Sequence, residues 1–222
     1  MDKAEEKETK VDRLTYLIEN GAYVRNFQNF EAREAQPEAE GGAKELYVEG
    51  VATPFNTPTI LYSYDGVDYK EQIDARAFDE TNMTDVIFNY NHCGKVLART
   101  RNSTLTLSVQ ADGLHMRARL DGTEEGRKLY EEIKGGYVDR MSFLFVAEES
   151  SYNETEHLRT VRKVKRLYDV SAVDIPAYDT TSISARSSFA VEIEKERKAA
   201  EAEKLRRRIL DAQIEQTMKK RR

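Results

Sequence analysis

Residues 104–120, TLTLSVQADGLHMRARL, restrict the possible folds of this chain more than any other stretch, because apolar and polar residues alternate along it. Successive side chains of a β-strand point to opposite faces, so such alternation is typical of strands with one buried face. The dipeptide Asp112-Gly113 in the middle is a strong signal for a hairpin turn. We therefore expect two antiparallel strands whose apolar residues share a face: Leu105, Leu107 and Val109 in the first, and Leu114, Met116, Ala118 and Leu120 in the second.

The period of the pattern changes directly after this hairpin. In residues 122–136, GTEEGRKLYEEIKGG, Thr123 is a candidate N-cap, and two glutamates occupy the first turn behind it. Leu129 and Ile133 are separated by four residues and would share one face of a helix, and Gly135-Gly136 is a stop signal. The segment predicts one short amphipathic helix.

Four further segments have strand character. They are ELYVEGVATPF, TDVIFNYNH, YVDRMSFLFVAEE and HLRTVRKVKRLYDVSAVDIPAY, and the polar stretch SSYNETE joins the last two. No internal repeat is present in the sequence. We therefore expect an α+β fold, mainly antiparallel β, in which a small β-barrel or curved sheet carries flanking helices.

Composition divides the chain into three regions. Residues 1–42 form an N-terminal segment, in which a short amphipathic piece leads to EAREAQPEAEGG, whose composition is that of a flexible acidic linker. Residues 43–187 hold nearly all the strand signal and are predicted to form the main domain. Residues 188–222 are almost continuously charged, contain no Gly or Pro, and predict a single helical tail.

The predicted tail has its own pattern of charge and apolar residues. From Glu192 to Arg222 it carries 11 Lys/Arg against 7 Asp/Glu, so its net charge is +4 and that of the remaining chain is −9. Apolar residues recur at spacings of 3, 4 and 3, as in the seam of a coiled coil: Ala202, Leu205, Ile209 and Ala212. An assembly helix and a solvated charged helix both fit this pattern. The final KKRR could bind an acidic scaffold surface through its charge.

Bulk properties exclude several classes of protein. A chain of 222 residues is sufficient for one domain with appendages, and its single cysteine excludes an internal disulfide, so cytoplasm is the expected compartment. The first residues, MDKAEEKETK, lack the apolar stretch of a secretory signal. No apolar run approaches the roughly 20 residues of a membrane span. The net charge of −5 gives no overall attraction to nucleic acid.

The stretch DVIFNYNHCGKVLART, residues 85–100, places His92 beside the only cysteine, Cys93. Because neighbouring residues of a strand point to opposite faces, these two side chains are not expected to form a nucleophile–base pair. A zinc site is also not indicated, because His92, Cys93, His115 and His157 show none of the recognised ligand spacings. Two interpretations remain, a histidine in a turn and a general base. The second requires a nucleophile and an orienting acid elsewhere in the chain.

Two later segments supply candidates for those roles. Ser142 lies in GGYVDRMSFLF between two apolar residues, and composition alone favours the structural interpretation, a strand hydroxyl bonded to a nearby carbonyl. Asp169 lies in RLYDVSAVDIPAY, where an ion pair with a neighbouring cation such as Lys165 is the structural alternative. Taken singly, these residues leave the structural alternatives open.

Five segments carry a resemblance when they are taken together and in chain order: YVEGVATPFN, YKEQIDARAFDE, VIFNYNHCGKVLARTRNSTLTLSVQADGLHMRARL, GRKLYEEIKGGYVDRMSFLF and RTVRKVKRLYDVSAVDIPAYDTTSISARS. In this order they resemble the prohead maturation proteases of tailed bacteriophages. The resemblance extends from Leu46 to Ser187, with His92 placed 50 residues before Ser142. It implies a serine endopeptidase related in fold to herpesvirus assemblin.

The resemblance also implies roles for individual residues. His92 matches the base of the family and Ser142 matches its nucleophile. Asp169 matches the third member, which is more often a glutamate with one more methylene. Asp174 is a fallback acid, but it aligns with a position that is not acidic in the family.

Two positions depart from the pattern of the family. Leu144 stands where a glycine is usual, which bears on the geometry of the oxyanion hole because glycine often permits a close backbone approach. Cys93 stands where an acidic residue is usual. Neither departure removes a member of the predicted triad.

The resemblance implies an enzyme that acts in capsid assembly, inside the prohead and within the host cytoplasm. Its expected substrates are scaffold protein or the scaffolding segment of the major capsid protein, and the chain itself. Further copies of the chain are expected as partners. No cofactor or metal, membrane or nucleic acid is expected. A non-enzymatic capsid assembly protein on the same fold is the alternative, and a protease fused to its own scaffold is a third, for which a 35-residue tail is short.

Overall fold

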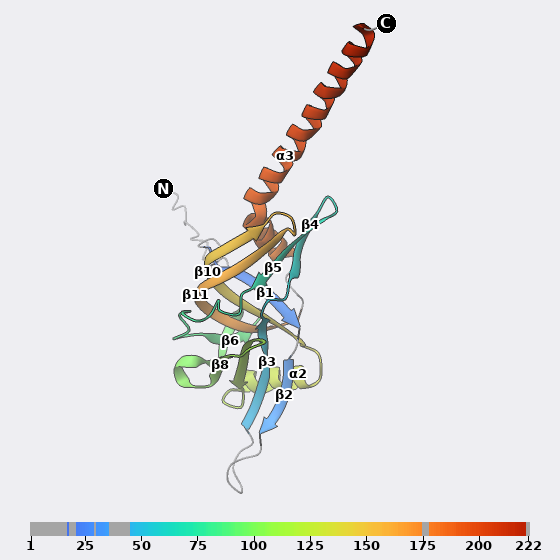
Figure 1. The fold of residues 1–222 in the computed structure, drawn as a ribbon. Coiled ribbons are helices and arrows are strands. Elements are labelled where there is room, and N and C mark those ends of the chain that lie inside the picture. Colours follow the sequence, from blue (N-terminus) through green and yellow to red (C-terminus); the bar gives the residue numbers. More distant parts are fainter. Residues whose placement is uncertain (1–16, 18–20, 29, 36–44, 175–177, 221–222) are drawn as a thin grey trace, which may run out of the picture. The chain divides into compact units, whose positions relative to one another are not determined.

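The computed structural model describes residues 17, 21–28, 30–35, 45–174 and 178–220. The chain divides into two compact units, Met1–Ser184 and Ala185–Arg222, and each is described by itself (Figure 1). The first unit holds the strands and the second is part of a helix. Among the described residues, no helix combines the length and apolar character that crossing a membrane requires.

The strands of the first unit form two sheets. The larger sheet has the order β1-β10-β11-β5-β4, with β6 pairing to both β11 and β7, and the smaller has the order β2-β3-β9-β8. The strands of the larger sheet are β1 (Tyr23–Gln28), β4 (Thr59–Tyr64), β5 (Val67–Ile73), β6 (Ile87–Tyr90), β7 (Cys93–Arg99), β10 (Arg140–Asn153) and β11 (Leu158–Val173). Those of the smaller sheet are β2 (Phe30–Ala35), β3 (Glu45–Pro54), β8 (Leu105–Val109) and β9 (Gly113–Arg119).

The α+β class with mainly antiparallel pairing, predicted from the sequence, is confirmed, and among the named strands the parallel pairs are those of β11. Its residues 158–161 pair in parallel with β5, and its residues 169–172 pair in parallel with β6. One long strand therefore uses the same edge for two partners in succession. Among the residues that the structure describes, the strands form two open sheets and no closed barrel, so the predicted small barrel is not confirmed.

The predicted hairpin is present as β8 and β9, which pair antiparallel. Of the second strand's apolar set, Leu114, Met116, Ala118 and the following Leu120 are all buried. Gly113 is required by close packing rather than by an unusual backbone angle. A Cβ at Gly113 would lie 2.5 Å from the Thr53 carbonyl oxygen on β3, so this glycine lets two strands of the smaller sheet approach.

The predicted helix is α2 (Glu124–Lys134). The Thr123 hydroxyl accepts a hydrogen bond from the Gly126 backbone N–H at 3.0 Å, as an N-cap should. Leu129 and Ile133 are buried on its inner face. The chain leaves the helix through Gly136, whose positive φ of 74° suits glycine. The predicted cap, the predicted buried face and the predicted glycine stop are therefore all present in this helix.

One apolar core joins the two sheets and α2. It contains buried residues from both sheets and from the helix, including Val48, Phe88, Met116, Leu129, Phe143, Phe145, Leu167 and Val170. A second, smaller cluster consists of Ala22, Val24 and Leu144, with Leu17, Val146 and Tyr168 packed against it. Leu144 lies between Phe143 and Phe145, which belong to the main core, and so points to the opposite face of the sheet. Around β10 the larger sheet therefore has apolar contacts on both faces.

Three strand segments lie where the sequence predicted no strand. Residues 150–153, read as part of a polar connection, continue β10, because they pair with β11 across a long hairpin. Residues 23–28 and 30–35, read as N-terminal segment and linker, form β1 and β2 within the two sheets. Main-chain pairing with distant strands overrides a polar composition, which is why the local signal failed there. The rest of the predicted linker, residues 36–42, lies outside the described residues.

The predicted C-terminal helix is present as α3 (Tyr178–Lys220), which begins ten residues before Ser188 (Figure 1). Salt bridges between residues three or four apart run along its exposed surface, such as those of Arg197 with Glu194 and Glu201. Two members of the predicted seam, Leu205 and Ile209, are exposed. The side chain of Ala212 lies outside the described residues.

Candidate active site

His92 lies in the two-residue turn between β6 and β7, where Tyr90 pairs with Cys93. Asn91 and His92 both have positive φ, 51° and 57°. Positive φ at both central residues is what a tight type I′ hairpin requires, and Asn and His tolerate it better than most residues. In this turn the imidazole does not follow the alternation of side chains along the strands. His92 is buried, with 7% of its surface exposed.

Ser142 lies on β10 of the larger sheet, between β1 and β11. Its neighbours Met141 and Phe143 point into the main core, so alternation directs the serine to the opposite face. Ser142 is fully buried. The strand thus holds the Ser142 hydroxyl on the face away from the main core.

Asp169 lies on β11, next to β10 and with only 1% of its surface exposed. Val170 belongs to the main core, so Asp169 also points to the face that carries Ser142. In the register of the two strands Asp169 is opposite Leu144, two residues beyond Ser142. This offset leaves room for the imidazole of His92 between the serine and the carboxylate.

The three predicted site residues are brought together in this way. His92 Nδ1 lies 2.6 Å from Asp169 Oδ1, and His92 Nε2 lies 2.6 Å from Ser142 Oγ. In a neutral imidazole only one ring nitrogen carries a proton, and an ionised carboxylate can only accept. The proton therefore lies on Nδ1, and Nε2 is left as the acceptor for the serine hydroxyl. Chemically, this arrangement is able to serve as a nucleophile, a base and an orienting acid.

The serine hydroxyl has a second acceptor within reach. Ser142 Oγ also donates to the main-chain carbonyl of Arg25 on β1, at 3.0 Å. The Arg25 side chain is itself buried and anchored, because its Nε and Nη2 donate to Glu71 at 2.5 and 3.0 Å. One hydroxyl proton therefore faces two acceptors, the base and the main chain of β1.

Two further polar side chains of this region, Ser171 beside the imidazole and Asn89 bonded to Ser171, were not identified from the sequence. Ser171 Oγ lies 3.2 Å from His92 Nδ1 and 3.1 Å from Asp169 Oδ1, and it is also hydrogen-bonded to Asn89. A signal was present, because Ser171 is two residues beyond Asp169 and so shares its face of β11. Asn89 becomes a neighbour only through the pairing of β6 with β11.

The fallback acid and the two unusual positions lie elsewhere. Asp174 is exposed and accepts a hydrogen bond from the Tyr90 hydroxyl at 2.7 Å, which raises the pKa of Tyr90. Leu144 packs with Ala22 and Val24 in the smaller apolar cluster. Cys93 is an exposed free thiol whose Sγ lies 3.5 Å from the Tyr90 carbonyl oxygen. The geometry therefore favours Asp169 over Asp174 as the partner of His92.

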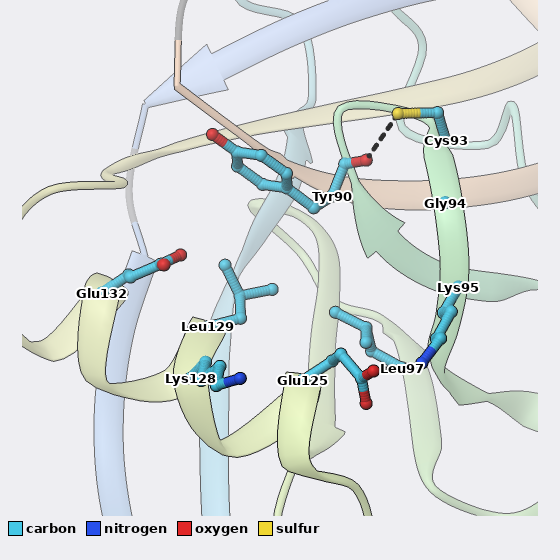
Figure 2. A pocket seen from close by; sticks show the side chains of 9 residues that line it. All are labelled: Tyr90, Cys93, Gly94, Lys95, Leu97, Glu125, Lys128, Leu129 and Glu132. Atoms are coloured by element: carbon cyan, nitrogen blue, oxygen red, sulfur yellow. Dashed lines mark hydrogen bonds and ion pairs between the residues drawn. The ribbon is translucent and has the colours of Figure 1, made fainter.

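A pocket of about 370 Å³ lies beside the hairpin that carries His92 (Figure 2). Its walls come from β6, β7 and α2, with Tyr90, Leu97 and Leu129 as its apolar part. Lys95 and Glu125 form an ion pair at its rim, which lowers the pKa of Glu125. Tyr90 and Leu129 both pack in or against the main core, so this pocket opens on the face of β6 opposite to the three site residues.

The remaining histidines lie apart from this site. His115 Nε2 lies 2.8 Å from an Asp112 carboxylate oxygen, and the His157 ring packs against Tyr69. Within the part of the chain that the structure describes, no group of three or more His, Cys, Asp or Glu side chains is arranged to hold a metal ion.

Comparisons with known proteins bear on the same region. A family profile described as caudovirus prohead serine protease matches residues 29–197, a range that contains His92, Ser142 and Asp169. Among solved structures, the capsid assembly protease of bacteriophage T4 shares 18% sequence identity with the chain. The match covers 70% of this chain and 98% of the T4 chain, with a TM-score of 0.46. No curated protein matches the chain.

Proposed function

Because the chain belongs to the family of caudovirus prohead serine proteases, we propose that it is a Ser-His-Asp endopeptidase whose triad is Ser142, His92 and Asp169. The observation that carries this assignment is the unbroken series of buried contacts, 2.6 Å from carboxylate to imidazole and 2.6 Å from imidazole to hydroxyl. A turn histidine in a merely structural role needs neither of these partners. The hydroxyl and the carboxylate come from neighbouring strands of one rigid sheet, which suits a preorganised site.

The proposed reaction follows from these positions. Ser142 Oγ attacks the carbonyl carbon of a peptide bond, while its proton passes to His92 Nε2. Asp169 stabilises the imidazolium and holds the proton on Nδ1. The imidazolium then protonates the leaving amine, and a water molecule hydrolyses the acyl-enzyme with His92 again as base. Backbone N–H groups are the expected donors to the oxyanion, and removal of one such donor typically costs about 10²–10³-fold in rate.

The contact with β1 adds a condition to this reaction. A proton donated to the Arg25 carbonyl is not available to His92, so the hydrogen bond to β1 opposes activation of the nucleophile. Ser142 is also fully buried, whereas a scissile carbonyl must reach its hydroxyl. We propose that substrate binding requires a local displacement around β1, with Ser142 then bonded to His92 alone.

Substrates and location are proposed from the family. The prohead is the setting in which such an enzyme acts, so we propose scaffold protein or the scaffolding segment of the major capsid protein as substrate, and the chain itself as a further one. Cleavage would take place inside the assembling shell in the host cytoplasm, by a chain that associates with further copies of itself. The alternative, a non-enzymatic assembly protein on the same fold, predicts binding without cleavage.

Co-expression distinguishes these two functions. The chain is produced together with the capsid and scaffold proteins of its phage, and all products are measured by intact-mass spectrometry. Shortened capsid, scaffold or protease chains with defined new termini would support the endopeptidase. Shells that assemble without any new terminus would identify an assembly protein and overturn the proposal.

The choice of acid can be tested by comparing two isosteric substitutions. Asp169→Asn should lower kcat by a large factor, up to about 10⁴-fold, because the amide lets the imidazole rest with its proton on Nε2. Asp174→Asn should change kcat by much less, because that side chain is exposed and bonded to Tyr90. Initial rates on one peptide substrate give the comparison. A larger loss for Asp174→Asn would show that the acid was assigned wrongly, while the enzyme class would stand.

The division between protease domain and tail remains a proposal, and deletion tests it. Removing residues 192–222 should leave the strand-rich unit folded and active on a free peptide, because the tail surface is charged and exposed. Incorporation into assembling shells should fall, and should also weaken with salt, since a short seam and a basic end make the proposed contact. Co-sedimentation of both forms with shells at low and high salt measures this. Equal incorporation of the full-length and truncated proteins would show that the tail is only a solvated helix. An insoluble truncated protein would show that the protease domain extends beyond the proposed boundary.

A further inference from the structure

We infer that Ser171, supported by Asn89, is a positioning residue that holds the carboxylate of Asp169 against the imidazole of His92. The inference rests on the proposed function of the triad and extends it. In the sequence Ser171 is marked only by its place two residues beyond Asp169, and Asn89 reads as an ordinary polar residue of a strand. The sheet gives them a role by placing them in line with the nucleophile.

The register of the sheet aligns three polar residues across neighbouring strands. Ser142 on β10 is directly opposite Ser171 on β11, and Ser171 is directly opposite Asn89 on β6. Their sequence neighbours on the other face, among them Phe143, Ala172 and Phe88, belong to the main core. The three side chains therefore form a polar row on the face that carries the proposed triad, and Asp169 lies beside this row.

The contacts of Ser171 converge on the hydrogen bond between His92 and Asp169. Its Oγ lies 3.1 Å from Asp169 Oδ1, the same oxygen that bonds the imidazole, and 3.2 Å from His92 Nδ1. Asn89 Oδ1, at 2.5 Å, is a second acceptor for the single hydroxyl proton of Ser171. Ser171 is fully buried and Asn89 is 2% exposed, so these contacts are shielded from bulk water. The hydroxyl thus touches both partners of the pair and is itself anchored.

These contacts restrict motions that the triad cannot tolerate. A carboxylate can rotate about its bond to Cβ, and an imidazole in a turn can tilt, and either motion lengthens a bond that is now 2.6 Å. The single hydroxyl proton of Ser171 faces two acceptors. Donated to Asp169 Oδ1, it keeps that oxygen facing the ring; donated to Asn89 Oδ1, it fixes the hydroxyl so that its lone pairs face the Nδ1 proton. Buried hydrogen bonds of this kind are rigid, because breaking one leaves a polar group without a partner. A misplacement of the base by a fraction of an ångström reduces proton transfer steeply.

A simpler role for Ser171 has to be separated from this one. A buried strand hydroxyl can serve only to satisfy Asn89, in which case its removal would weaken the sheet and affect activity through folding. The two roles differ in their dependence on Asp169. A residue that acts through the carboxylate loses its effect once the carboxylate is gone, whereas general structural damage adds to any other loss.

The test is a double-mutant cycle on the full chain, measured with a peptide substrate that the wild type cleaves. Ser171→Ala should lower kcat by roughly 10- to 100-fold with little change in KM, since it removes a positioning contact and no substrate contact. In the Asp169→Asn background the same substitution should cost less than about 2-fold, because both changes disable one unit. Thr53→Val is the matched control: it removes a buried strand hydroxyl that is bonded to Pro54, and should leave kcat unchanged.

Asn89→Ala gives a second route to the same answer if Ser171→Ala does not fold. It removes the anchor of the hydroxyl, so it should lower kcat by a smaller factor, and this loss should also vanish in the Asp169→Asn background. Wild-type kcat in a folded Ser171→Ala or Asn89→Ala variant would overturn the inference. Losses that multiply with that of Asp169→Asn would overturn it too, by showing structural damage. Cleavage that survives Ser142→Ala would instead overturn the proposed triad, and this inference with it.

Discussion

Replacing Ser142 with alanine is expected to abolish cleavage and leave the fold intact. The hydroxyl is the proposed nucleophile and the one bonded to His92 Nε2, so its removal should lower kcat by about 10⁶-fold, below detection in most assays. The cost in stability should be small, about 1 kcal/mol, because the change deletes one oxygen and leaves the Arg25 carbonyl and His92 Nε2 without that partner. Cleavage of a peptide or of co-expressed capsid protein measures the first effect, and thermal unfolding measures the second.

Cys93→Ser is the matched control for this experiment. The thiol is the chain's only cysteine and lies next to His92 in sequence, so it is the obvious rival nucleophile. It is exposed, however, and contacts the Tyr90 carbonyl rather than the imidazole. The variant should therefore retain wild-type activity. If Ser142→Ala still cleaves and Cys93→Ser does not, Cys93 and not Ser142 is the nucleophile.

Replacing His92 should be as severe as replacing Ser142, because a serine hydroxyl without a base is a poor nucleophile. His92→Ala is expected to lower kcat by about 10⁶-fold as well. His92→Asn is the better-behaved variant, because asparagine tolerates the positive φ of 57° at this position and so preserves the turn. Both variants should be inactive, and His92→Asn should unfold at a temperature close to that of the wild type.

The combination of the two substitutions separates catalysis from structure. A variant with both Ser142→Ala and His92→Asn should be no less active than either single variant, because the residues act as one unit. Substantial activity in His92→Asn would assign the histidine to the turn alone. Losses that add up in the double variant would point the same way, since independent structural defects are additive.

Much of the local structure could be predicted from residues close together in the chain. The alternation of residues 104–120 predicted β8 and β9, and the buried apolar residues of β9 are those the pattern selects. Thr123 predicted the start of α2, and Leu129 and Ile133 predicted its buried face. Such signals are reliable because their cause is local: a cap bonds its own helix, and a strand buries every second residue. The three proposed triad residues were likewise selected from their segments, through resemblance to a family.

The contacts of the proposed site depend on pairings that no local pattern encodes. His92 contacts Ser142, 50 residues away in the sequence, and Asp169, 77 residues away. Both contacts depend on the register of β10, β11 and β6. A shift of one residue in any of these pairings would turn the side chains to the other face. The same holds for Ser171 and Asn89, which were not identified from the sequence, and for Arg25, which was assigned to a short amphipathic piece of the N-terminal segment.

Whether the strands form a closed barrel or open sheets is the clearest example of what the sequence leaves undecided. The strand composition indicated a barrel or a curved sheet without distinguishing them, because alternation describes what each strand buries and not which strand it pairs with. That choice depends on the length of β11, which pairs first with β5 and then with β6 along one edge. The sequence by itself therefore determined the elements, their buried faces and the candidate residues. Only the tertiary structure decided which strands are neighbours, and so which polar side chains meet, because register is settled by packing across the whole sheet.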